Sequence, residues 1–157
     1  MANGGGVLGV DGRQSEAAAA IGRGTHRLLR SLGFNCLPEV VLRSGRRADL
    51  VAVNARGIIW IVEIKSSVAD FRADHKWQDY QYHCDGLLFA TSPAVPEVIF
   101  PPDAGLIVAD PYGGSLIRPA PVCPLPSATR REMLLRFALT AADRLHRLTD
   151  PTAAELI

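Results

Sequence analysis

The chain has 157 residues, 48% of them hydrophobic and 21% charged, a globular composition that excludes an intrinsically disordered protein. Its length fits one domain with a hydrophobic core, and its net charge of +1 argues against a general polyanion binder. The longest apolar run, residues 57–62, is too short to span a bilayer, and no signal-peptide pattern is present, so we expect a cytoplasmic protein with no membrane partner.

Apolar periodicity predicts one domain over residues 15–150, between a flexible N-terminal tail at residues 1–14 and a C-terminal tail at 151–157. Ser15 is a suitable N-cap for the first helix. In chain order we expect a helix at 15–32, strands at 37–42, 48–53 and 58–65, a helix at 68–83, a strand at 86–90, a helical turn at 95–99, strands at 106–109 and 115–117, a proline-rich linker at 119–126 and an amphipathic helix at 129–148. The predicted fold class is α/β, with a central mixed β-sheet flanked by helices.

The charges are segregated along the chain. Residues 13–47 carry a net charge of +5, residues 48–117 carry −5, and residues 118–147 carry +4. An acidic centre between basic flanks suits a metal site beside a phosphate-binding surface. The alternative is that the arginine-rich helices are solvated, with the arginine stems covering apolar surface. The three cysteines are odd in number and far apart, so they predict neither a disulfide framework nor a zinc site.

Two acidic residues and a lysine lie on neighbouring predicted strands. Glu63 and Lys65 share one face of their strand because strand side chains alternate with a period of two, and Asp49 can face Glu63 across the hairpin. Two carboxylates on adjacent strands form a hard oxygen site for Mg²⁺ or Mn²⁺, to which the carbonyl of Ile64 can add an oxygen. Lys65 would then orient or deprotonate the attacking water and stabilise charge on a phosphate.

A structural interpretation of the same residues stays open. The pattern Glu-x-Lys occurs in many proteins, and an ion pair of the lysine with Glu or Asp at the end of the sheet would also explain it. Against this, Glu63 and Lys65 interrupt an apolar strand, where charges are costly unless they are paired or functional. The spacing alone does not decide between the two interpretations.

The stretch resembles the PD-(D/E)XK nuclease superfamily. Asp49 matches its first acidic position and Glu63-Ile64-Lys65 matches its (D/E)-x-K element, although Ala48 stands where many members have proline. The resemblance implies a restriction-endonuclease-like core and a metal-dependent hydrolase in which Asp49, Glu63 and Lys65 are catalytic.

Three further residues extend the resemblance. Glu16, the acid of the first predicted helix, would assist a second metal ion. Gln78 and Tyr82 match the Gln-x-x-x-Tyr pair of RecB-like members, and residues four apart share one face of an α-helix. They would align the substrate, Gln78 within the catalytic set and Tyr82 as a DNA contact. Asp70 and Asp74 fall in the first turns of the same predicted helix, where capping explains them without function.

Within the superfamily, the chain most resembles the MmcB-type DNA-repair proteins of bacteria, over most of residues 15–110. The resemblance rests on Arg47-Ala48-Asp49-Leu50 and residues 62–67, and continues through Asp70-Phe71, Asp74, Lys76-Trp77, Asp79-Tyr80 and Cys84-Asp85. It implies a role in DNA repair, an endonuclease activity and a place at the bacterial nucleoid.

Additional DNA contacts are predicted around the motif. Arg46 and Arg47 precede the acidic strand and can contact phosphates, although an exposed pair in a turn fits equally well. Lys76, with the aromatic residues Trp77 and Tyr80, can form a basic and aromatic surface for DNA. Packing on the sheet is the alternative for the two aromatic residues, and we favour it for Trp77.

These patterns lead to a metal-dependent DNA endonuclease that hydrolyses phosphodiester bonds in DNA repair, with Mg²⁺ or Mn²⁺ as cofactor. A protein of another class also fits, namely a DNA-binding adaptor of a repair complex with weak or no catalysis. An RNA-processing nuclease with the same site is a third alternative. The expected partners are DNA, other DNA-repair proteins and, because dimers are common in the superfamily, a second copy of the chain.

Overall fold

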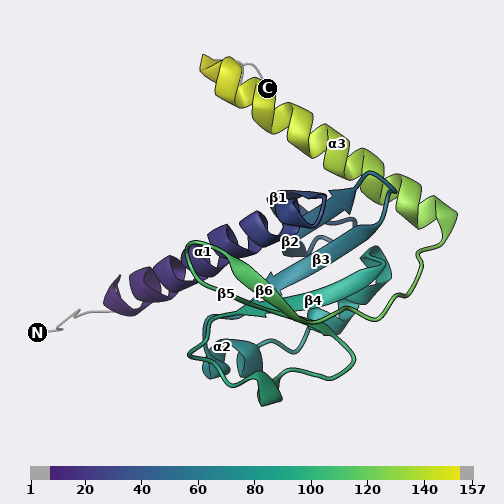
Figure 1. The fold of residues 1–157 in the computed structure, drawn as a ribbon. Helices are drawn as coiled ribbons and strands as arrows, with labels where there is room; N and C mark the ends of the chain where they lie inside the picture. Colours follow the sequence, from purple (N-terminus) through teal and green to yellow (C-terminus); the bar gives the residue numbers. More distant parts are fainter. Residues whose placement is uncertain (1–7, 153–157) are drawn as a thin grey trace, which may run out of the picture.

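A computed structural model describes residues 8–152, with side chains from residue 16 on (Figure 1). Three α-helices, two short 3₁₀ helices and six strands follow one another along this part of the chain. Their bounds are α1 Leu8–Ser31, β1 Phe34–Val41, β2 Arg47–Asn54, β3 Ile59–Ile64, α2 Val68–Ala73, η1 Trp77–His83, β4 Gly86–Thr91, η2 Glu97–Ile99, β5 Gly105–Ala109, β6 Gly114–Arg118 and α3 Ser127–Thr149. None of the helices between residues 8 and 152 is long and apolar enough to cross a membrane.

The six strands form one sheet in the order β1-β2-β3-β4-β5-β6. Strand β2 is antiparallel to both of its neighbours, β1 and β3; β3, β4 and β5 are parallel, and β6 returns antiparallel to β5. The β2–β3 turn is closed by Gly57 at φ +75° and by the side chain of Asn54, which accepts hydrogen bonds from two backbone N–H groups of the turn. The prediction of a central mixed sheet flanked by helices is confirmed.

Hydrophobic residues cover both faces of the sheet. On one face, Ile21 and Leu29 of α1 pack on strand residues that include Leu50 and Val62. On the other face, Met133 of α3 belongs to a second buried cluster with residues of β1 to β4 and of η1. Each such fully buried side chain contributes about 1.5–3 kcal/mol. The sheet is thus packed on both faces. The polar residues at the ends of β2 and β3 therefore lie next to apolar side chains.

Helix α1 is longer than predicted. It begins at Leu8, so residues 8–14, which we expected in the tail, are helical, and Ser15 lies inside the helix and does not cap it. The remainder of the predicted tails, residues 1–7 and 153–157, lies outside the described residues.

The prediction of a single helix over residues 68–83 is wrong. Ser67 caps α2 by accepting a hydrogen bond from the N–H of Asp70, but the helix ends after six residues, where Asp74 adopts an extended conformation. The Asp74 side chain bonds to Lys65 and to the N–H of Lys76, and this turns the chain out of the helix. A separate 3₁₀ helix, η1, follows.

Helix α3 packs apolar side chains on the sheet with its first half only. Arg130 in its first turn pairs with buried Asp85 at the start of β4, and Met133 is buried. The C-terminal half extends beyond the sheet (Figure 1). Leu145 and Leu148, at the end of the predicted amphipathic helix 129–148, are therefore exposed, Leu148 by 79%.

Candidate active site

The candidate site lies where β2 and β3 separate. The regular pairing of the two strands ends at Leu50 and Val62. Beyond that point side chains take the place of the backbone acceptors of the β-ladder. The Asp49 carboxylate accepts a hydrogen bond from the N–H of Ile64 at 2.8 Å, and the Glu63 carboxylate accepts one from the N–H of Asp49 at 3.1 Å. These bonds fix both carboxylates beside each other, as the strand spacing predicts.

Burial changes the charge of this carboxylate pair. Glu63 is only 4% exposed, and loss of water together with the negative charge of Asp49 raises its pKa to about 8. Burial also raises the pKa of Asp49. At neutral pH the pair therefore retains a proton, which a divalent cation would displace.

The residues present fit a hard divalent cation. Both carboxylates offer oxygen donors, and the carbonyl of Ile64 lies between Glu63 and Lys65 in the sequence. Among the side chains of residues 16–152, however, no three His, Cys, Asp or Glu residues gather into a group that could hold a metal. A cation bound here would therefore need backbone, water or substrate oxygens in addition to Asp49 and Glu63.

Lys65 is buried and paired. It is 6% exposed, and its Nζ lies 2.7 Å from the carboxylate of Asp74. Partial burial by itself raises the pKa of Asp74. Hydrogen bonds from Lys65 and from the N–H of Lys76 outweigh this effect and hold the pKa below its usual value. Thr91 donates a hydrogen bond to the Lys65 carbonyl at 2.7 Å and anchors the end of β3. The ion pair that the structural interpretation required is thus present, with Asp74 as the partner.

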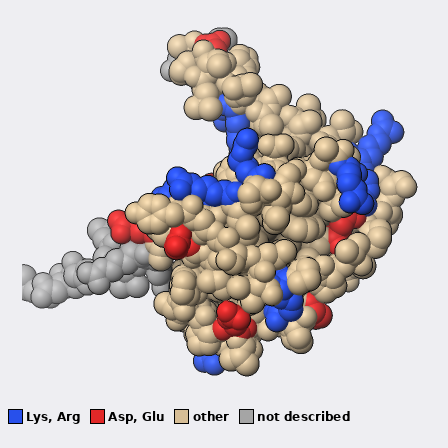
Figure 2. Space-filling model, viewed as in Figure 1, with Lys and Arg blue, Asp and Glu red and all other residues tan. Residues whose placement is uncertain are grey.

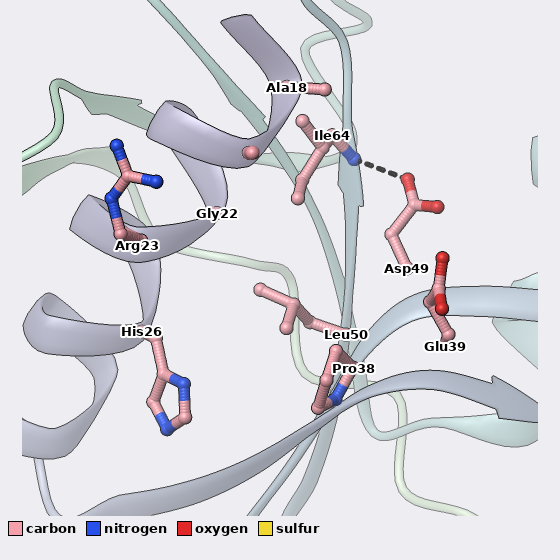
Figure 3. A pocket seen from close by; sticks show the side chains of 10 residues that line it. Ala18, Gly22, Arg23, His26, Pro38, Glu39, Asp49, Leu50 and Ile64 are labelled. Carbon is pink, nitrogen blue, oxygen red and sulfur yellow. Dashed lines mark hydrogen bonds between the residues drawn. The ribbon is translucent and has the colours of Figure 1, made fainter. Parts of the chain in front are cut away.

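Asp49 also lines a cleft of about 450 Å³ between α1 and the sheet (Figure 3). One wall carries Arg23 and His26 of α1, and the other carries Glu39 of β1. Figure 3 shows the Asp49 carboxylate bonded to the Ile64 N–H. Burial, and next the charge of Arg30, lower the pKa of His26, so this side chain is neutral at pH 7.

Comparison with known proteins decides the family. The profile of the MmcB-like DNA repair proteins matches residues 7–152. The chain belongs to the MmcB-like family. The structure of the SPO1766 protein of unknown function from Silicibacter pomeroyi is similar to this MmcB-like chain, with 39% sequence identity, a TM-score of 0.83, and coverage of 86% of this chain and 92% of that one. No curated protein matches the chain.

The MmcB-like fold brings some of the predicted residues together and separates others. Asp49, Glu63, Ile64 and Lys65 meet at the split between β2 and β3. Glu16 is exposed on α1 and is absent from the lining of the cleft, so nothing places it beside the two carboxylates.

The expectation that Gln78 and Tyr82 share a helix face is wrong. They lie on η1, and a 3₁₀ helix has three residues per turn, so positions four apart are a third of a turn away from each other. Both side chains are exposed, Tyr82 by 76%. Between them Tyr80 is buried, and its hydroxyl donates to the carbonyl of Arg47. Tyr80 therefore packs on the sheet, and Trp77 packs beside Phe89.

The predicted basic contacts of the MmcB-like chain are on the surface. Arg46 forms an ion pair with Asp79 at 2.6 Å, while Arg47 and Lys76 are exposed. Their role in DNA binding stays a prediction.

Three residues near the site were not expected from the sequence. Asp74 was explained as a helix cap, which is right for Asp70, whose carboxylate accepts from the N–H of Ser66, but wrong for Asp74. Its place within the MmcB-type stretch was the available signal. Arg23 and His26 carried no signal, because their position in the cleft depends on how α1 crosses the sheet.

Proposed function

We propose that this chain hydrolyses phosphodiester bonds of DNA in DNA repair, in a reaction that requires Mg²⁺ or Mn²⁺. The observation that carries the proposal is the carboxylate pair of half-buried Asp49 and buried Glu63, held side by side where β2 and β3 separate. Asp49 lines the cleft, and Lys65 follows on the strand face of Glu63. Membership of the MmcB-like DNA repair family supports DNA as the substrate.

The roles of the residues follow from their contacts. Asp49, Glu63 and the Ile64 carbonyl would hold the cation, which supplies Lewis-acid activation of the phosphodiester. The hydrogen bonds from two backbone N–H groups keep the carboxylates oriented without the substrate. Asp74 fixes the Lys65 ammonium on the face that carries Glu63, where it would stabilise the negative charge that grows on the phosphate. Together these residues would form a preorganised site that holds a cation and stabilises a phosphate beside it.

Cleavage assays test the proposal. Branched, flapped and single-stranded DNA are incubated with Mg²⁺ or Mn²⁺ and the wild type, Asp49→Asn or Lys65→Ala, with Asp103→Asn, an exposed acid outside the site, as the matched control. We expect the two site variants to lose at least about 100-fold in rate and the control to keep its activity. Equal cutting by all four proteins would show that the site is wrongly assigned.

A second candidate is a DNA-binding adaptor without catalysis. The ion pair of Lys65 with Asp74 favours it, because a buried pair can serve the fold alone. Calorimetric titration with Mn²⁺ separates the two candidates. Retained DNA binding without any heat of metal binding in the wild type would support the adaptor and contradict the nuclease.

A further inference from the structure

The cleft beside Asp49 has the size of a small-ligand site. Its volume of about 450 Å³ falls within the range of pockets that enclose small molecules, and it is too small to enclose a duplex. On the α1 side the cleft is kept open by small residues, namely Ala18, Ala19 and Gly22. The opposite wall is formed by Pro38 and Glu39 of β1. A ligand in the cleft would thus reach the Asp49 carboxylate between α1 and β1.

Each basic flank of the sequence supplies one arginine at or beside this cleft. Arg23 of α1 lines it directly. From the other side Arg144 of α3 donates hydrogen bonds to the carbonyls of Pro38 and Glu39, which places its guanidinium at the β1 wall. On the face drawn in Figure 2, blue Lys and Arg side chains gather where α1 and α3 approach each other. The positive charge is therefore on the rims, and the acids Asp49 and Glu39 are inside.

This arrangement suits a phosphate chain that runs through the cleft. The acidic interior repels phosphate unless a cation is bound, whereas the rims attract the phosphates before and after the one at the site. The floor also contains Leu50 and Ile64, whose apolar side chains can pack against a sugar or a base. A second, paired strand would have to share a space that α1 closes on one side and β1 on the other.

We propose that a single DNA strand passes through the cleft between α1 and β1, with Arg23 and Arg144 contacting phosphates on its two sides. The substrate class is then single-stranded DNA, including flaps and gaps, and not intact duplex. This inference rests on the proposed function, because it assigns the substrate of the same site.

Binding is measured apart from cleavage. Fluorescence anisotropy with Ca²⁺, a hard cation that takes oxygen ligands, in place of Mg²⁺ follows one labelled oligonucleotide as a single strand, as a blunt duplex, as a duplex with a flap and as the corresponding RNA strand. Ala19→Phe fills the cleft, and Ala17→Phe places the same side chain on an exposed position of α1 outside the cleft. Arg23→Ala and Arg144→Ala are compared with Arg56→Ala, which lies in the turn at the far end of β2.

We expect the single strand and the flap to bind at least about tenfold more tightly than the blunt duplex. Ala19→Phe should weaken this binding about tenfold, and Ala17→Phe less than twofold. Arg23→Ala and Arg144→Ala should each weaken it several-fold and reduce the slope of log affinity against log salt by about one, with no change in Arg56→Ala.

The outcomes separate this inference from the proposed function. Equal binding of duplex and single strand, with Ala19→Phe behaving like Ala17→Phe, would overturn the cleft assignment even if metal-dependent cutting of DNA is observed. Tighter binding of RNA than of DNA would overturn the assignment to DNA. Cleft-dependent binding of single-stranded DNA without any cleavage would support this inference and contradict hydrolysis.

Discussion

For the individual side chains at the split between β2 and β3, burial away from water determines which groups can carry a charge. Glu63 loses its solvent next to Asp49, and its pKa rises to about 8. Lys65, equally buried, is neutralised by the carboxylate of Asp74. The charge of Glu63 is thus suppressed by a retained proton, whereas the charge of Lys65 is balanced by Asp74. Removal of Asp74 would leave a buried charge without a partner, which costs stability.

Replacement of Glu63 by glutamine should stabilise the metal-free protein. The folded chain holds a proton on Glu63 up to about pH 8, whereas the unfolded chain releases it near 4.5, so the wild type loses stability as the pH rises between these values. In EDTA at pH 8 we expect Glu63→Gln to gain at least about 1.4 kcal/mol, the value of one pKa unit, in urea unfolding. A flat pH profile of the wild type over this range would refute the expectation.

Replacement of Asp74 by asparagine should be costly. It leaves the Lys65 ammonium buried without its partner, and we expect a loss of about 3 kcal/mol in the free energy of unfolding. Asp79→Asn makes the same change in the exposed pair with Arg46 and should cost less than about 1 kcal/mol. Urea denaturation at pH 7 measures both, and equal losses would mean that the buried pair contributes no more than a surface pair.

Among the secondary-structure elements, α3 is attached at its start to the sheet through a buried ion pair. The Asp85 carboxylate accepts hydrogen bonds from the N–H groups of Ile59 and Leu125 and from the guanidinium of Arg130, which also donates to the carbonyl of Gly57. The start of α3, the β2–β3 turn and the start of β4 are thus joined at one buried charge.

Replacement of Arg130 by leucine should loosen this attachment and change its pH dependence. Burial by itself raises the pKa of Asp85, but hydrogen bonds from Arg130 and two N–H groups outweigh it and hold this pKa below 3.8. The stabilisation by the ionised carboxylate is therefore present at neutral pH and is lost as the pH falls below 3.8. We expect Arg130→Leu to lose about 3 kcal/mol at pH 7 and to show a shallower acid transition. Thermal unfolding from pH 7 to pH 2 tests this, with exposed Arg131→Leu as a control that should match the wild type.

The strands were predictable because their signal is local. Each strand has its own run of β-branched and apolar residues, and Asn54 and Gly57 mark the turn that brings Asp49 near Glu63. The break at Asp74 was not predictable, because it depends on Lys65, nine residues earlier on another element. For the same reason the spacing of Gln78 and Tyr82 suggested an α-helix that does not form.

At the scale of the whole molecule, stability is unevenly distributed. The sheet is covered on both faces, whereas α1 begins with residues beyond it and α3 ends beyond it (Figure 1). The cleft lies where these two helices meet β1. A binding site between a rigid sheet and two projecting helices combines fixed acids with rims that can adjust to a strand.

Hydrogen–deuterium exchange should reveal this gradient. In α3 the amides of residues 145–149 should exchange at least about tenfold faster than those of residues 133–137, because apolar packing on the sheet is confined to the first half of the helix. Uniform protection along α3 would mean that its last turns have a partner in solution.

Arg136 donates a hydrogen bond to the carbonyl of Val41, as Arg144 does to those of Pro38 and Glu39. These bonds to β1 have a consequence for crowded cells. Strand β1 is an outer strand of the sheet, and the carbonyls of Pro38, Glu39 and Val41 would otherwise be free to recruit a strand from another chain. Guanidinium groups occupy these acceptors, and a foreign strand would have to displace them. The helix that forms one rim of the cleft thereby also protects the protein against edge-to-edge aggregation.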